Sequence, residues 1–265
     1  MLDIMTQAMN AIEAYNDALK VHSANIANMS VTGYKRLDPS FQSLFERALR
    51  SGTAATSTSG GTNPMQIGQG AALSNIAVDM SQGSFIEGNS IDLAITGSGF
   101  FIVSNDGGQT YQYTRAGKFN LDANGNLVTS TGMQVYGTQA GGNLVPISGL
   151  SGSYTDYSWD GAGNLLYKGS TTGYQIALSY FANPSGLTQT SGTTLSESLA
   201  SGAPSTPMAP GGAAGSITSG NTEQSNVFYL GETIDSQEIQ RAMSGNLSVV
   251  RMASDIISSF ISKLG

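Results

Sequence analysis

Two stripes of apolar side chains, one near each end of the chain, constrain the fold more than any other feature. The residues of each stripe are alternately four and three positions apart. This heptad spacing predicts two long helices that each bury one face against other helices. The N-terminal seam comprises Met5, Ile12, Tyr15, Leu19, His22, Ile26 and Met29, with Met1 and Ala8 completing its spacing. The C-terminal seam comprises Ile239, Met243, Asn246, Val250, Ile257, Phe260 and Leu264, with Ala253 completing its spacing.

The two helices are expected to be only marginally stable as an isolated pair. Ordering a helix backbone costs about 1–2 kcal/mol per residue, and a seam side chain returns about 1.5–3 kcal/mol only when it is fully buried. A single pairing would bury one stripe of each helix and leave other apolar residues exposed, namely Leu2, Met9, Val21, Leu247 and Ile261. We therefore expect helices from further copies of the chain to cover these surfaces. The alternative is a helix pair packed on the rest of a monomer.

Between the helices the pattern changes from helical spacing to short apolar runs that are separated by turn residues. Examples are FFIV at 100–103 and KFNL at 118–121, which are typical of strands joined by close reversals. The predicted fold class is α+β, with terminal helices flanking a mainly antiparallel β body. The expected segments are an N-terminal helix and turn at 1–36, an extended linker at 37–74, the β body at 75–187, a polar return segment at 188–222 that could complete the β body, and a C-terminal helix at 223–265.

Composition excludes several classes of protein. The net charge of −7 argues against nucleic-acid binding, which requires basic clusters. No stretch of 18 consecutive apolar residues exists, so membrane insertion is not expected, and the N-terminus lacks the pattern of a cleavable signal peptide. With one histidine and no cysteine, we expect no catalytic residue, no metal and no cofactor.

Single residues carry further expectations. His22 is interpreted as a packed or interface residue, because no second histidine or cysteine could share a metal with it. Asn246 lies in a seam, where a buried amide selects helix register. Gly33 is expected to end the first helix, and Gly231 and Gly245 weaken the second by about 1 kcal/mol each.

A resemblance to the bacterial flagellar rod and hook proteins extends over nearly the whole chain. The N-terminal signature of that family is matched by Asn25, Ile26, Ala27, Asn28, Thr32, Gly33, Tyr34 and Lys35. Ala24 stands where the family often has a further asparagine. The C-terminal pattern is matched by Ser225, Asn226, Val227, Glu232, Gln240, Arg241 and Asn246. The body resembles the family at 92–101, 113–119, 125–128 and 181–187.

The resemblance implies a structural subunit of the flagellar axial tube, outside the cytoplasm. Such a subunit would leave through the flagellar export apparatus without signal cleavage. It would then polymerise with copies of itself and with other flagellar axial proteins through its terminal helices. The segment that follows the first helix, residues 23–36, would turn the chain outward from the tube wall.

The sequence supports a hook function and a rod function almost equally. The chain of 265 residues has no room for a large outer domain, which favours a rod protein, the rigid drive shaft. The run at 61–70 resembles the hook branch, and on balance it favours a short hook protein, the universal joint. A secreted β-rich binding module is a remote alternative. A two-carboxylate hydrolase is another, for which Asp92, Asp122 and Asp160 are the available acids.

Overall fold

The computed structural model describes residues 2–44, 46–56, 60–68, 70–139 and 142–264. The chain forms two compact units. The helical unit contains Met1–Ile26, Leu37–Ala77 and Tyr229–Gly265, and the β unit contains Ala27–Arg36 and Val78–Phe228. The predicted α+β class is confirmed, because a helix at each end flanks an antiparallel β body.

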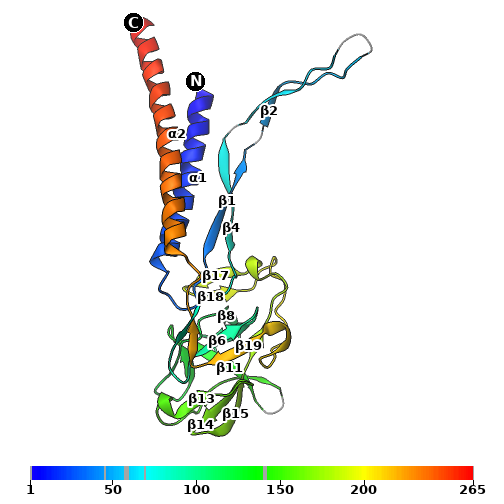
Figure 1. Cartoon of the computed structure of the whole chain (residues 1–265), viewed down its shortest axis with the longest axis vertical. Helices are drawn as coiled ribbons and strands as arrows, with labels where there is room; N and C mark the ends of the chain where they lie inside the picture. The colour runs from blue at the N-terminus through cyan, green and yellow to red at the C-terminus, as the bar shows by residue number, and fades with distance from the viewer. Residues whose placement is uncertain (1, 45, 57–59, 69, 140–141, 265) are drawn as a thin grey trace. The chain divides into compact units, whose positions relative to one another are not determined.

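The helical unit contains both long helices, which lie side by side in Figure 1. Its elements are α1 (Leu2–Ala27), α2 (Tyr229–Leu264), β1 (Leu37–Ser43), β2 (Glu46–Arg50), β3 (Met65–Gly68) and β4 (Ala71–Val78). The strands form two two-stranded sheets, one of β1 with β4 and the other of β2 with β3. Gly231 and Gly245 do not interrupt α2, which continues through both positions. The segment expected as an extended linker thus contributes strands, of which β1 packs Phe41 against Tyr15 of α1 with ring centroids 5.5 Å apart.

The first helix is shorter than the sequence indicated. It ends at Ala27, before Met29, the last residue of the predicted seam. A turn follows in which Val31 N donates to Asn28 O at 3.0 Å. Gly33 therefore does not end the helix. It lies in the later part of the turn with a φ of +71°, in the left-handed region that glycine adopts without strain.

Small residues form the buried face of α1. Within this chain its buried apolar residues are Ala8, Ala11, Ala14, Ala18 and Val21. Val21 was expected to be exposed and is instead buried, at 7% exposure. The alanine face is adjacent to the predicted seam, so the helical unit buries small side chains and leaves larger seam residues at its edge.

The β unit is built on one large antiparallel sheet. Its main path runs β13-β14-β15-β11-β7-β8-β18-β17, and β9, β10, β12 and β16 join beside it. Two short pairs, β6 with β19 and β5 with β20, lie outside that sheet. The strands are β5 (Phe85–Glu87), β6 (Leu93–Thr96), β7 (Phe100–Ser104), β8 (Gln112–Thr114), β9 (Phe119–Leu121), β10 (Leu127–Thr129), β11 (Gln134–Gln139), β12 (Leu144–Pro146), β13 (Tyr157–Trp159), β14 (Asn164–Tyr167), β15 (Ser170–Ile176), β16 (Leu178–Ser179), β17 (Thr188–Ser191), β18 (Thr194–Ser196), β19 (Ser216–Ser219) and β20 (Asn221–Glu223). Three short 3-10 helices connect them, at Tyr154–Asp156, Pro184–Gly186 and Gly212–Ala214.

The core of the β unit is aromatic and aliphatic. Strand β7 is buried along its whole length, and Phe101 meets Phe119 edge to face with centroids 5.2 Å apart. Trp159 is buried, and its Nε1 donates to Ile91 O at 2.7 Å. The polar return segment completes this body through β17 to β20, of which β18 pairs with β8 and β19 with β6.

Candidate assembly site

A buried polar cluster joins the two helices of the helical unit. His22 Nδ1 lies 2.7 Å from Glu232 Oε2, and Asn25 Nδ2 donates to the same oxygen at 3.0 Å. All three side chains are buried. Asn25 also holds the start of β1, because its amide donates to Leu37 O and its Oδ1 accepts from Leu37 N. One asparagine of the family signature therefore fixes both α2 and the chain that leaves the turn.

His22 is thus a partner of a carboxylate within its own chain. A buried carboxylate needs partners, and Glu232 finds them in His22 and Asn25. The described residues contain no group of three or more His, Cys, Asp or Glu side chains that could hold a metal ion. Through the contacts of His22 and Asn25 with Glu232, the cluster links α1 to α2.

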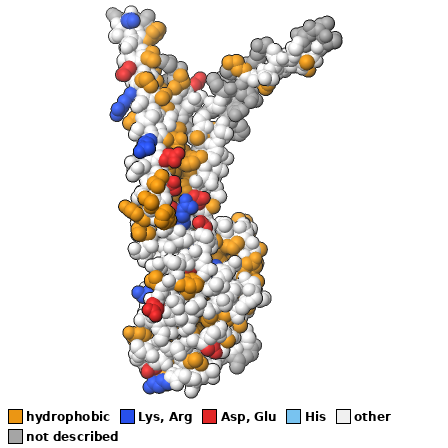
Figure 2. Space-filling model, viewed as in Figure 1, with side chains coloured by type: hydrophobic (Ala, Val, Ile, Leu, Met, Phe, Trp, Pro, Cys, Tyr) orange, Lys and Arg blue, Asp and Glu red, His pale blue; other side chains and the backbone are white. Residues whose placement is uncertain are grey.

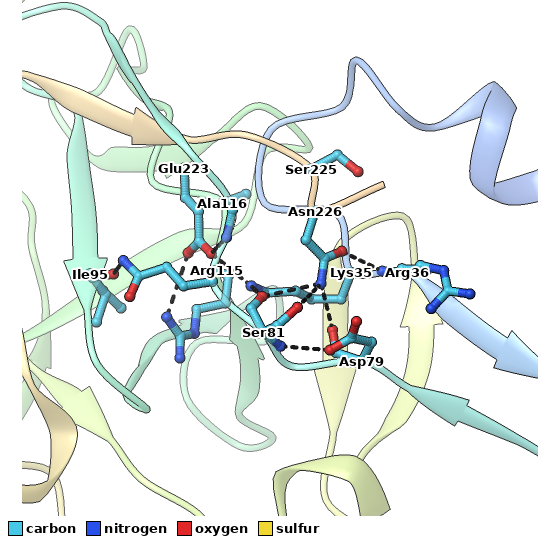
Figure 3. A network of polar contacts seen from close by, with 12 residues as sticks. Lys35, Arg36, Asp79, Ser81, Ile95, Arg115, Ala116, Glu223, Ser225 and Asn226 are labelled. Carbon is cyan, nitrogen blue, oxygen red and sulfur yellow. Dashed lines mark hydrogen bonds and ion pairs between the residues drawn. The ribbon is translucent and has the colours of Figure 1, made fainter. Parts of the chain in front are cut away.

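A second polar network lies in the β unit and centres on Glu223 of β20 (Figure 3). Lys35 Nζ donates to Glu223 Oε1 at 2.7 Å and to Ser81 O at 2.7 Å. Arg115 reaches Glu223 Oε2 through Nη1 at 3.5 Å and donates from Nη2 to Gly97 O at 2.6 Å. Glu223, Lys35 and Arg115 are all buried. Burial lowers the pKa of Lys35 and the pKa of Arg115, and the charge of Glu223 opposes both shifts.

The turn after α1 is held in this network at two further points. Gly33 N donates to Glu223 O at 2.8 Å, and a Cβ at Gly33 would lie 2.6 Å from Ala116 Cα, so only glycine fits this approach. Asn226 accepts from Arg36 N at 2.7 Å and donates to Asp79 O at 2.9 Å. The signature residues of the turn therefore contact residues nearly two hundred positions away in sequence.

The remaining signature residues have less distinctive positions. Tyr34 is buried, Asn28 and Thr32 are half-buried, and Ala27 is exposed. Ser225 Oγ accepts from Val227 N at 3.2 Å at the approach to α2. On α2 itself, Gln240 and Arg241 are exposed. Their side chains are therefore accessible to other molecules.

Seam residues are for the most part not fully buried within the chain. In the N-terminal seam, Ala8 and His22 are buried. Met5, Ile12, Tyr15, Leu19 and Ile26 are half-buried, and Met29, which follows α1, is exposed. In α2, Ile239 is buried; Met243, Asn246, Val250 and Ile257 are half-buried and Phe260 is exposed. The side chain of Leu264 lies outside the described residues. The role of these seams in contacts between copies stays a prediction. So does the register role of Asn246, whose amide donates to Ala242 O within α2 at 3.0 Å.

Helix α2 carries many of the large apolar residues that are exposed in the described part of the chain. Figure 2 shows hydrophobic side chains along the surface of the helices. The exposed members on α2 are Tyr229, Leu230, Ile234, Leu247, Met252, Ile256, Phe260 and Ile261, each at least 42% exposed. We call these residues the α2 apolar surface. An extended apolar surface of this kind marks a site of protein or membrane contact, and no described helix is long and apolar enough to cross a bilayer.

The acids that a hydrolase would need are engaged in local structure. Asp92 is buried, and its two carboxylate oxygens accept from Asn89 N and Phe119 N. Asp122 and Asp160 each accept from backbone and side chain of an asparagine four residues later, Asn126 and Asn164. These hydrogen bonds lower the pKa of Asp122, and at Asp160 they outweigh a burial effect that alone would raise the pKa. Each acid therefore holds a turn and is not paired with a second carboxylate.

Comparison with known proteins shows two matching family models. A model described as the flagellar hook protein FlgE/F/G D1 domain matches residues 94–165. A model described as flagella basal body rod protein matches residues 5–35. The first covers the centre of the β unit, and the second covers α1 together with the turn up to Lys35.

Two relatives that match over nearly the whole chain are rod proteins. The flagellar basal-body rod protein FlgG of Bacillus subtilis (strain 168) is 32% identical over 265 residues, which covers 98% of each chain. FlgG of Agrobacterium fabrum is 31% identical over 264 residues and 97% of each chain. The flagellar hook protein FlgE of Helicobacter mustelae is 39% identical over 139 residues, which is 52% of this chain and 31% of that protein.

Together, the terminal helices, the β body and these matches define a structural component of the bacterial flagellum. Within that class, the chain belongs to the family of flagellar rod and hook proteins.

Proposed function

We propose that the chain is a rod subunit of the flagellar basal body, which assembles with copies of itself and with other axial proteins. The observation that carries this proposal is the length of the matches. Rod relatives align over 97–98% of both chains, whereas the hook relatives of Helicobacter align with only 22–31% of their own length. The sequence alone slightly favoured a hook protein, and the comparisons do not confirm that preference.

The α2 apolar surface supports assembly through the terminal helices. Burying apolar side chains contributes about 25 cal/mol per Å² removed from water, and neighbouring helices of other copies would supply that burial. The cluster of His22, Asn25 and Glu232 orders the helix pair within its unit, and the Glu223 network orders the turn within the β unit. Each part is thus ordered before copies associate, which lowers the entropy lost on association. We also infer from the family resemblance that the subunit leaves the cell through the flagellar export apparatus and functions outside the cytoplasm.

Complementation tests the rod assignment. The chain is expressed in Bacillus subtilis that lacks its own FlgG, and basal bodies are purified and imaged by electron microscopy. A rod subunit restores a straight rod with a hook beyond it. A curved tube in place of a straight rod would support the hook function instead.

A variant pair tests the role of the helices in the same strain. Replacing Ile256 and Phe260 together by serine removes two members of the α2 apolar surface, and we expect rods to be lost. Replacing the exposed Ser258 and Ser259 by alanine is the matched control and should leave rods intact. Normal rods with the Ile256→Ser, Phe260→Ser chain would contradict assembly through this surface.

A further inference from the structure

A small cavity lies beside the network of Glu223 in the β unit. Its volume is about 10 Å³, which is close to the smallest space that holds one water-sized particle. The cavity is lined by Gly33, Lys35, Val78, Arg115, Gln189, Thr193 and Leu195. Two of these residues, Lys35 and Arg115, are cations and none is an acid; the carboxylate of Glu223 contacts both cations.

Arg115 has unused hydrogen-bonding capacity at this place. The residue is 3% exposed, and its Nε is buried without a hydrogen-bond partner among the described residues. Its contact with Glu223 is long, at 3.5 Å, and its guanidinium carbon lies 4.9 Å from the centre of the Phe100 ring. Arginine stays charged in proteins, and a buried unpaired N–H of a charged group is costly. Among the described residues, the Nε of Arg115 therefore lacks an acceptor, whereas its two terminal nitrogens contact Glu223 and Gly97.

Lys35 adds a second positive charge on the same cavity. Its ammonium donates to Glu223 and Ser81, which accounts for two of its three donors. Among the described residues, Glu223 is the carboxylate that directly contacts both Lys35 and Arg115. The next acid that acts on Lys35 is the half-buried Asp79, whose carboxylate accepts from Ser81 N. Two buried cations thus share one buried anion.

We propose that this cavity binds a single monatomic anion, such as chloride, between Arg115 and Lys35. The small volume favours a monatomic anion over phosphate, sulfate or an organic carboxylate. The lining supplies two cations, and the one carboxylate of Glu223 that contacts them balances only one of the two charges. A bound halide accepts from the unpaired Nε of Arg115 and balances the second cation, and it thereby strengthens the contact of the turn at Gly33 and Lys35 with the β unit.

Thermal unfolding of the full chain tests the site, followed by the fluorescence of Trp159, which reports on the β unit. The melting temperature is measured in sodium chloride and in sodium gluconate at equal ionic strength. Chloride at ten times its Kd should raise the melting temperature by about 3–6 °C in a saturable manner. Equal melting temperatures in the two salts across the titration would overturn the proposal.

Arg115→Lys keeps the charge and removes Nε, so the shift caused by chloride should disappear in this variant. Arg251→Lys, at an exposed position of α2, is the matched control and should retain the full shift. A chloride shift of wild-type size in the Arg115→Lys chain would overturn the assignment of the site.

Crystals of the unaltered chain grown in sodium bromide give a test that does not depend on a variant. Anomalous diffraction should show a bromide within hydrogen-bond distance of Arg115 Nε. An ordered water at that position, without anomalous signal, would overturn the proposal.

Discussion

At the scale of single residues, Glu223 determines whether the turn after α1 can dock in the β unit. Its carboxylate accepts from Lys35 and Arg115 and from Gly83 N at 2.9 Å. A buried ion pair contributes little more to stability than apolar residues of similar volume would. Removing one partner is strongly destabilising, however, because the other charge stays buried without its counter-ion. Glu223 therefore acts as the counter-ion on which two other buried residues depend.

Glu223→Gln should lower the free energy of unfolding of the β unit by about 3–5 kcal/mol, because it leaves Lys35 and Arg115 without a buried negative charge. Denaturant unfolding monitored by Trp159 fluorescence measures this loss. The control is Glu87→Gln on the exposed strand β5, which should change stability by less than about 0.5 kcal/mol. Similar losses in the two variants would show that the network around Glu223 has no special role.

Asp122 makes the stability of its hairpin depend on pH. Hydrogen bonds from Asn126 lower the pKa of Asp122 in the folded chain below 3.8. The contribution of Asp122 to the free energy of unfolding is therefore present above about pH 4. It is lost as the pH falls through the lowered pKa that the group has in the folded chain. Asp122→Asn should flatten the fall in melting temperature between about pH 4 and pH 2, whereas Asp255→Asn at an exposed site of α2 should not. An unchanged acid profile in the Asp122→Asn chain would contradict this role.

At the scale of elements, the two helices differ in the size of the side chains that they bury within the chain. The face of α1 that the chain buries is made of alanines, which allow neighbouring backbone to come close. Helix α2 buries Ile239, Ala253 and Glu232 but leaves most of its large apolar residues exposed. One helix is thus adapted to packing inside the subunit, and the other carries surface that remains for partners.

Ala18→Leu should destabilise the helical unit by about 1–3 kcal/mol, because Ala18 is fully buried and the added atoms overpack a close contact. Circular dichroism during thermal unfolding measures the loss as a lower melting temperature of the helical signal. Ala27→Leu, at the exposed end of α1, is the control that adds the same atoms without crowding. An unaltered melting temperature for Ala18→Leu would show that the alanine face is loosely packed.

Local pattern was sufficient to predict the elements but not their long-range contacts. The heptad spacing predicted both helices, and the apolar runs predicted strands such as β7 and β9. The strands β17 to β20 were left open, because that segment has few large apolar residues to signal them. The pairing of Lys35 with Glu223 joins residues 188 positions apart, and no local pattern reports such a contact. Tertiary packing also decided that Val21 is buried and that α1 ends at Ala27.

At the scale of the whole molecule, the chain pairs several of its buried polar groups internally but leaves large apolar residues of α2 exposed. His22, Asn25 and Glu232 contact one another within the helical unit, and Glu223 contacts Lys35 and Arg115 within the β unit. The α2 apolar surface has no such partner among the described residues. The proposed rod function requires that further copies cover it.

Cysteine labelling measures that coverage directly, since the natural chain has no cysteine. Single cysteines are placed at Ile256 and Phe260, and maleimide labelling rates are compared between the dilute chain and the assembled rod. A cysteine at Ala253, which is 3% exposed within the single chain, is the control and should react slowly in both states. We predict that assembly slows labelling at both positions of the α2 apolar surface at least about tenfold, as expected for side chains removed from water. Rods in which Ile256→Cys and Phe260→Cys react as fast as in the free chain would contradict assembly through α2.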